Sequence, residues 1–186
     1  MFYHKTMTGI WLTVVLGLVT ACAGPWTQAP QRLSTPQWSI SPPSDWMQLE
    51  TGGAEMLSKD GPFLEYILIQ SRPLTQGFRF TKERLRTDML PDEAARVIAD
   101  NLRSDPLIRQ FRLIGSEPAT VGGVPGFKLT YSYLDQNGVA IQSVLYGVVL
   151  PHMYFDLRYT ATRRHYFDQE LPAFMKVLES LRFAST

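Results

Sequence analysis

Residues 127–161 read FKLTYSYL, DQNG, VAIQSVLYGVVL, PH and MYFDLRYTA, and this stretch decides the fold. In FKLTYSYL, apolar and aromatic side chains alternate with Lys128, Thr130 and Ser132, which is the period of a strand with one covered face. Asn-Gly within DQNG accepts the positive φ that a tight hairpin turn requires. The pattern therefore predicts an antiparallel meander of three strands, Phe127–Leu134, Val139–Leu150 and Met153–Ala161.

The residues before the meander predict further strands. These are Trp38–Ile40, Ala54–Ser58, Phe63–Gln70 and Ile108–Ser116. The turn residues Lys59-Asp60-Gly61-Pro62 join the second of these strands to the third. Because Phe63–Gln70 is apolar on both sides, we expect it to lie inside the sheet with both faces covered.

Two helices are predicted as well. Pro91 followed by Asp92 and Glu93 is typical of a helix start, and this helix is expected to end at Arg103. Near the C-terminus, large apolar residues recur at spacings of four and three, as in a helix that packs on a sheet. Because Pro172 removes a backbone donor, we expect that helix to begin near Leu171. Residues Gly122–Gly126 are expected to form a turn.

The N-terminus has the three-part layout of a secretory signal. Lys5 precedes the apolar run Ile10–Val19, which is too short to span a bilayer comfortably, and small residues lead to Cys22. Val19-Thr20-Ala21-Cys22 resembles the bacterial lipobox, which implies cleavage after residue 21 and a diacylglycerol, with acyl chains such as palmitate, on the Cys22 sulfur. Two or more acyl chains make membrane attachment lasting. An ordinary secretory signal and a short transmembrane anchor remain the alternatives.

The predicted organisation has three parts. Residues 1–21 are a cleaved signal peptide, residues 22–36 a flexible lipid-anchored linker rich in proline and polar residues, and residues 37–186 a single globular domain. Ala23 stands where an aspartate, by resemblance to lipoproteins of diderm bacteria, would favour retention in the inner membrane. The expected location is therefore the cell envelope, at the periplasmic face of the outer membrane rather than the inner membrane.

The order of elements resembles the PsbP-like proteins, over residues 37 to 183. The resemblance rests on the turn Lys59-Asp60-Gly61-Pro62, the segment Gly123-Val124-Pro125-Gly126-Phe127 that opens a strand, the tyrosine-rich meander, and a final helix ending in Leu178-Glu179-Ser180-Leu181-Arg182. It implies an α+β fold in which an antiparallel sheet is sandwiched between helices. It also implies a domain that binds partners without performing chemistry.

The charge and the cysteine content narrow the classes of function. The 186 residues include 18 Lys and Arg and 17 Asp and Glu, and removal of Lys5 with the signal leaves the chain neutral. A neutral domain lacks the positive field of nucleic-acid-binding proteins, so nucleic acid is not expected as a partner. The single cysteine excludes an internal disulfide and a thiolate zinc cluster. No metal and no cofactor are expected.

No catalytic motif is present in the sequence. Ser143, His152 and Asp156 supply the residue types of a nucleophile, base and acid, but no surrounding motif supports a triad. His152 and His165 are expected to be exposed. We therefore expect that the protein is not an enzyme and has no catalytic residues.

The most suggestive residues are the tyrosines of the meander and of the segment just after it. They are Tyr131, Tyr133, Tyr146, Tyr154, Tyr159 and Tyr166. Tyrosine is enriched on binding surfaces and also at half-buried sheet positions, so the first five are candidate ligand- or partner-binding residues and core packing is the alternative.

The sequence leaves three possible functions open. The first is an envelope lipoprotein that binds a protein partner as an assembly or accessory factor, attached to the membrane through Cys22. The second is a carrier or sensor of a small apolar or lipid ligand, and the third is a hydrolase.

Overall fold

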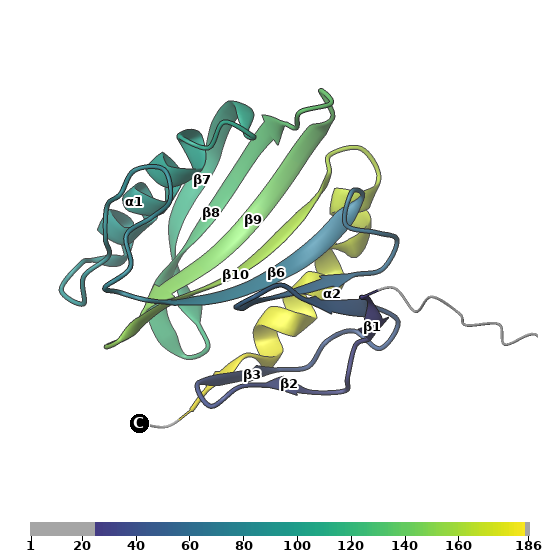
Figure 1. Cartoon of the computed structure of the whole chain (residues 1–186), viewed down its shortest axis with the longest axis horizontal. Coiled ribbons are helices and arrows are strands. Elements are labelled where there is room, and N and C mark those ends of the chain that lie inside the picture. The colour runs from purple at the N-terminus through teal and green to yellow at the C-terminus, as the bar shows by residue number, and fades with distance from the viewer. Residues whose placement is uncertain (1–24, 185–186) are drawn as a thin grey trace, which may run out of the picture.

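The computed structural model describes residues 25–184, which form two antiparallel sheets and two helices (Figure 1). The predicted signal peptide and the predicted lipidation site Cys22 lie outside the described residues. The strands are β1 (Thr27–Gln28), β2 (Leu33–Ser34), β3 (Trp38–Ile40), β4 (Met47–Glu50), β5 (Ala54–Ser58), β6 (Glu65–Pro73), β7 (Arg109–Val121), β8 (Val124–Leu134), β9 (Ala140–Val149), β10 (Met153–Thr162) and β11 (Arg182–Phe183). The helices are α1 (Pro91–Arg103) and α2 (Tyr166–Ser180).

The large sheet contains eight strands in the order β1-β4-β5-β6-β10-β9-β8-β7. The predicted meander is present as β8, β9 and β10, and it begins one strand earlier, at β7. β6 lies between β5 and β10, so the prediction of an interior strand is confirmed. Covered faces on both sides were also predicted, and that is wrong in part: Ile67 and Ile69 are buried on one face, whereas Tyr66 and Leu68 are only half-buried on the other.

Glycines set two of the three hairpin turns that join β7, β8, β9 and β10. Gly122 and Gly123 have φ values of 56° and 87° and form a two-residue turn, so β8 begins at Val124 and the predicted five-residue turn is wrong. In the next hairpin, Gly138 has φ of 80°, and the Asp135 carboxylate accepts the N–H groups of Asn137 and Val139 at 2.9 and 2.7 Å. These turns fix the register of the strands that they join.

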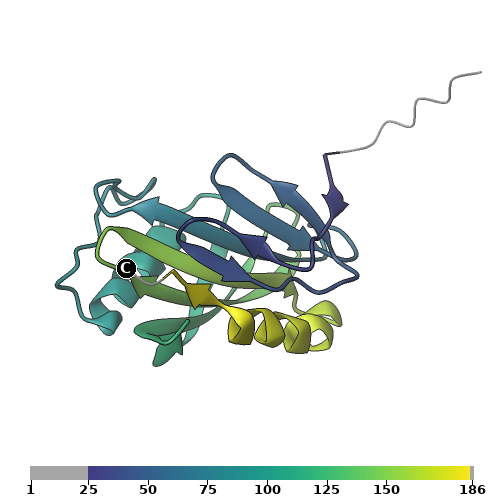
Figure 2. The same ribbon diagram turned by 90° about the horizontal axis from the view of Figure 1, so that it is seen from below.

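The helices pack on opposite faces of the large sheet, which confirms the predicted sandwich (Figures 1 and 2). α1 contacts β7, β8 and β9 on one face, where its buried residues Ala95, Ile98 and Leu102 meet Leu129 and Leu145. α2 contacts β10 and β6 on the other face, where Phe174 and Val177 join the larger core cluster. The sheet therefore separates two apolar cores.

The first helix matches its prediction, and the second begins earlier than predicted. α2 starts at Tyr166, so the expected start near Leu171 is wrong, and Pro172 lies inside the helix. A proline there removes its bond to the carbonyl four residues earlier, which belongs to the exposed Asp168 and can bond to water. Burial of Phe167 and Phe174 on the same core offsets that loss.

Part of the predicted linker belongs to the fold. β1 pairs with β4, β2 pairs with β3, and Ala29 is buried while its N–H donates to the Trp46 carbonyl at 2.9 Å. The prediction of a flexible segment up to Pro36 is therefore wrong from Thr27 onward. Proline and glutamine content indicated a linker, whereas single apolar residues at 29 and 33 dock the segment on the core.

A small sheet joins the two ends of the described chain. Its order is β11-β3-β2, with Phe183 paired to Trp38 and Arg182 to Ser39. Figure 1 shows β2 and β3 below the large sheet. The small sheet covers Phe155 of β10, whose ring meets those of Trp38 and Phe183 edge to face at 5.7 and 5.2 Å between centroids.

Replacing residues 27–34 by a Gly-Ser segment of equal length should lower the free energy of unfolding by about 2 kcal/mol. This substitution removes the buried side chain of Ala29 and the half-buried side chain of Leu33, each a contribution of about 1 kcal/mol. Urea unfolding of the full chain measures the change. An unaltered midpoint would show that the segment is a linker after all.

Among residues 25–184, neither helix is long and apolar enough to cross a membrane.

Candidate binding site

One part of the large sheet has no helix over it. α1 covers β7, β8 and β9, and the same face of β10 and β6 continues beyond the helix (Figure 1). Side chains alternate between faces along a strand, so Tyr154, Asp156 and Arg158 of β10 point to this face. Their antiparallel partners on β6 are Arg72, Gln70 and Leu68 in the same order. This polar row forms the floor of a cavity.

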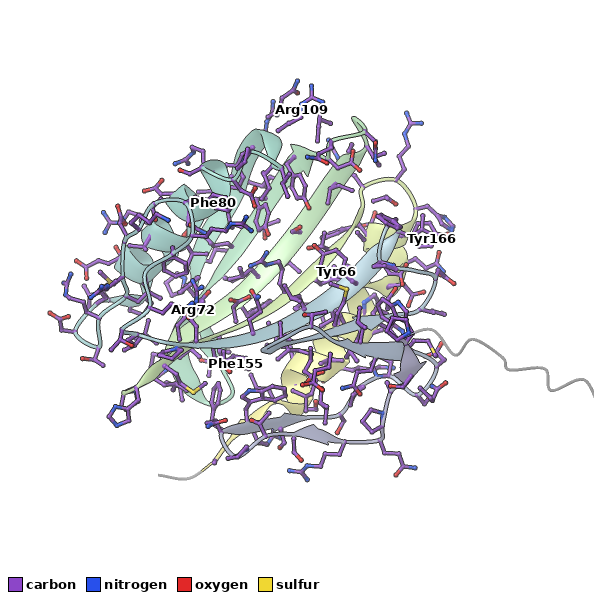
Figure 3. All side chains as sticks on the ribbon, in the orientation of Figure 1. Tyr66, Arg72, Phe80, Arg109, Phe155 and Tyr166 are labelled. Atoms are coloured by element: carbon purple, nitrogen blue, oxygen red, sulfur yellow. The ribbon has the colours of Figure 1, made fainter. Side chains whose placement is uncertain are left out.

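The cavity has a volume of about 530 Å³. One wall is α1, through Ile98, Asn101 and Leu102, and the adjoining wall is the segment 76–80 that leads toward α1. The opposite rim is residues 51–54, at the start of β5. Figure 3 shows Arg72 and Phe80 beside the open part of the sheet between α1 and β6. The volume lies within the range of small-ligand sites.

The floor holds an ion pair with unused hydrogen-bonding atoms. Arg158 Nη2 lies 3.5 Å from Asp156 Oδ1, and Asp156 is only 4% exposed. Asp156 Oδ1, Arg158 Nε and the Tyr154 hydroxyl are buried and have no hydrogen-bond partner in the described structure. Burial raises the pKa of the Asp156 carboxyl, and the nearby Arg158 and Arg72 guanidinium groups and the adjacent Tyr154 hydroxyl oppose that rise. Burial also raises the pKa of Tyr154 well above its ordinary value, so its hydroxyl stays protonated.

Two arginines reach the wall of the cavity and stack on aromatic rings there: Arg72, which extends from the floor strand β6, and Arg79. The Arg72 guanidinium lies 4.5 Å from the centroid of Phe78, and that of Arg79 lies 5.4 Å from the centroid of Phe80. Within the described chain neither arginine has a carboxylate within ion-pair distance. Stacking holds a guanidinium in place while leaving its edge free to bind an acceptor.

The structure does not bring the five candidate tyrosines together. Tyr131, Tyr133 and Tyr154 pack with the core under α1, and Tyr146 and Tyr159 pack with the core under α2, on the opposite face. Four of them are buried and Tyr133 is half-buried, so a shared solvent-open groove is ruled out and core packing is the better description. Tyr154 alone among the five lines the cavity.

The residue types of a catalytic triad are also apart. Ser143 is buried, with its hydroxyl 2.9 Å from that of Thr160, while His152 is exposed in the turn between β9 and β10. Asp156 pairs with Gly147, four residues along β9 from Ser143. Among residues 25–184, no group of three or more His, Asp or Glu residues is placed to hold a metal ion.

The sequence carried a signal for this cavity that the prediction did not use. Met153–Ala161 alternates as expected, yet the face opposite Phe155 carries Asp156 and Arg158, a charged pair inside an interior strand. Charged residues are rarely buried unless they are paired or functional, so an interior strand with two of them indicates a site. Arg72 lies 86 residues before Arg158 in the chain, so the sequence alone does not show that the two are close. The pairing of β6 with β10 brings them together.

Replacing Tyr154 by phenylalanine should leave the free energy of unfolding unchanged within about 0.5 kcal/mol, or raise it slightly. The lost hydroxyl is buried without a partner, and removal of an unsatisfied polar group is not destabilising. The ring contacts with Phe127 and Phe78 stay in place. Chemical unfolding of the two proteins measures the difference, and a loss above about 1 kcal/mol would mean that the hydroxyl is hydrogen-bonded.

A second depression is apolar and lies at the start of β10, beside Met153. It has a volume of about 820 Å³, and its lining includes Val124, Leu150, Met153 and Phe183. It is separate from the polar cavity, although Arg72 and Ser71 touch both.

No protein-family model matches the sequence, and no curated protein matches it. Several solved structures are similar, and three of them follow. LpqN, a protein involved in cell envelope biogenesis of Mycobacterium tuberculosis, is 18% identical over 80% of this chain and 83% of its own, with a TM-score of 0.59. The cyanobacterial PsbP protein CyanoP of Synechocystis sp. PCC 6803 is 15% identical over 90% of this chain and 100% of its own, with a TM-score of 0.60.

The third structure is a protein of Bacteroides thetaiotaomicron. It is 13% identical, covers 83% of this chain, and has a TM-score of 0.54, and the similarity spans 48% of its own length. At these identities the likeness concerns the fold. The fold is α+β and PsbP-like, as the resemblance in the sequence implied.

Proposed function

We propose that this chain is a lipid-anchored accessory protein of the cell envelope, which binds an envelope protein without catalysing a reaction. The observation that carries the proposal is the cavity over β6 and β10. It contains buried donors and acceptors without partners and two arginines stacked on aromatic rings, which a bound group could pair with. The lipobox at Cys22 supports the anchor. The fold shared with LpqN, which is described as involved in cell envelope biogenesis, supports the location.

The anchor is tested by metabolic labelling with palmitate in a bacterial host. Wild-type chain should incorporate the label and fractionate with membranes, while Cys22→Ser should remain unlabelled. Separation of inner from outer membrane then tests the expected outer-membrane location. Recovery of an unlabelled wild-type chain with residues 1–21 still attached would contradict the proposal.

The partner is tested by photo-crosslinking in intact cells. Arg79 is an exposed residue at the cavity wall, and Lys176 is an exposed residue of α2 on the opposite face of the sheet, so a crosslinking amino acid at each position gives a matched pair. We expect one defined adduct from position 79 that is absent from position 176. Identical adduct patterns from both positions would contradict binding at the cavity.

A carrier of a small apolar or lipid ligand is the second candidate. The apolar depression formed by Val124, Leu150, Met153 and Phe183 favours it. Native mass spectrometry of gently extracted protein should then show a bound mass that Met153→Arg removes. Protein of unliganded mass would count against this candidate.

A further inference from the structure

The polar cavity offers several unpaired hydrogen-bonding atoms, and its floor and its wall favour different chemical groups. Asp156 Oδ1 is an acceptor, Arg158 Nε is a donor, and the Tyr154 hydroxyl is both. These residues line one cavity, and Asp156 and Tyr154 are only 4% and 2% exposed. A buried polar atom without a partner destabilises the protein, so a ligand that pairs with these atoms gains affinity from them.

A hydroxyl group fits the floor because it donates and accepts at once. The ligand O–H can donate a hydrogen bond to Asp156 Oδ1, while its oxygen accepts one from Arg158 Nε or the Tyr154 hydroxyl. A bare anion does not fit the floor alone, since it offers no proton and would face the Asp156 carboxylate. A ligand with adjacent hydroxyls satisfies more of these atoms than one with a single hydroxyl.

The wall, by contrast, favours an anion. Three arginines line the cavity, Arg72, Arg79 and Arg158, against the two carboxylates Asp105 and Asp156. Asp156 is matched by Arg158, and Asp105 Oδ1 already accepts the Leu107 N–H at 2.9 Å. Arg72 and Arg79 are left without a carboxylate partner within the described chain, and both are held in place by Phe78 and Phe80. Their free donor edges match phosphate or carboxylate oxygens.

We infer that the cavity binds an anionic polyol, a small molecule or headgroup that carries a phosphate or carboxylate next to hydroxyl groups. Arg72 and Arg79 bind the anion, and the hydroxyls pair with Asp156, Arg158 and Tyr154. The amide nitrogen of Asn101 is a further donor at the wall, because its oxygen is held by the Phe80 N–H at 3.2 Å. This goes beyond the proposed function, since the site can be filled with or without a protein partner.

The test uses the full chain, purified in a neutral detergent, and isothermal titration calorimetry with sn-glycerol 3-phosphate. Glycerol supplies the hydroxyls without the anion, and inorganic phosphate supplies the anion without the carbon-bound hydroxyls. We expect glycerol phosphate to bind at least tenfold more tightly than either. Equal affinity for inorganic phosphate, or no heat with glycerol phosphate at millimolar concentration, would overturn the inference.

Variants assign the binding to the cavity. Arg72→Gln removes one anion contact at the wall and should weaken binding of glycerol phosphate at least tenfold. Arg164→Gln is the matched control, because Arg164 is exposed in the turn before α2 and does not line the cavity. Thermal unfolding of both variants checks that they are folded. Equal affinities of Arg72→Gln and wild type would overturn the assignment.

The source of the ligand is decided by competition. Vesicles of phosphatidylglycerol carry a glycerol phosphate headgroup, and vesicles of phosphatidylcholine do not carry free hydroxyls. Displacement of glycerol phosphate by the first and not the second assigns a lipid headgroup as the ligand. Displacement by neither assigns a soluble anionic polyol. A failure of the Cys22 labelling experiment would leave these results intact, so the two proposals fail separately.

Discussion

Replacing Phe155 by alanine should lower the free energy of unfolding by about 4 kcal/mol, the largest effect that we expect from a single side chain. Phe155 is completely buried in β10, on the face toward α2 and the small sheet. Its ring meets Trp38 of β3 and Phe183 of β11 edge to face, and aromatic pairs of this kind add about 0.5–1.5 kcal/mol beyond area burial. The substitution leaves a void between the two sheets.

Phe63→Ala is the matched control for this prediction. Phe63 is 92% exposed in the turn before β6, so the same chemical change should cost less than about 0.5 kcal/mol. Urea unfolding of the three proteins measures both numbers. A cost for Phe155→Ala below about 1.5 kcal/mol would show that the small sheet is not anchored on this ring.

Replacing Glu65 by alanine should lower the free energy of unfolding by about 3 kcal/mol. Glu65 is completely buried, and its Oε1 accepts the N–H groups of Lys59 and Asp60 at 2.7 and 2.9 Å and the Ser58 hydroxyl at 3.2 Å. The carboxyl thereby closes the turn between β5 and β6. Alanine leaves the N–H groups of Lys59 and Asp60 without this acceptor, whereas the Ser58 hydroxyl still donates to the carbonyl of residue 65.

The Glu65→Gln variant tests whether the hydrogen bonds or the negative charge of Glu65 stabilise the turn. Glutamine keeps an oxygen for the same donors, so we expect its stability at pH 7 to lie within about 1 kcal/mol of wild type. Equal losses for the alanine and glutamine variants would mean that the charge, rather than the hydrogen bonds, is what stabilises the turn.

The same residue predicts how stability changes with pH. Burial raises the pKa of Glu65 above its ordinary value of 4.5, although the N–H groups of Asp60 and Lys59 and the Ser58 hydroxyl oppose the rise. The folded state therefore binds more protons than the unfolded state above pH 4.5, and the free energy of unfolding falls as pH rises through the folded pKa. Asp156 contributes in the same direction. Urea unfolding between pH 4.5 and 8 should show a shallower decline for Glu65→Gln, and an identical slope would contradict this prediction.

Local patterns predicted the parts of the fold that local forces determine. The strands β8, β9 and β10 follow from alternation and from the Asn137-Gly138 turn, and α1 follows from Pro91 with its acidic first turn. The PsbP-like arrangement followed from the order of these elements. In each case the deciding contacts lie within a few residues of one another in the chain.

Predictions failed where distant contacts override a local preference. Thr27–Gln28 and Leu33–Ser34 have linker composition and become strands because β4 and β3 supply partners. Pro172 enters a helix because Phe167 and Phe174 both reach the core. The cavity needs Arg72, Asp156 and the wall of α1, and only the strand order brings them together. The tyrosines were predicted as a binding surface because of their number, but they lie on opposite faces of the sheet.

The pairing of β3 with β11 has a consequence for the order of events during synthesis. Ser41 and Ser180 are hydrogen-bonded across the same junction, 139 residues apart in the chain. A ribosome releases Trp38 long before Phe183, so the nascent polypeptide keeps an incomplete small sheet until residue 183 has emerged. The small sheet therefore becomes complete only after Arg182 and Phe183 are free to pair with β3, which makes it a late part of the fold to form during synthesis.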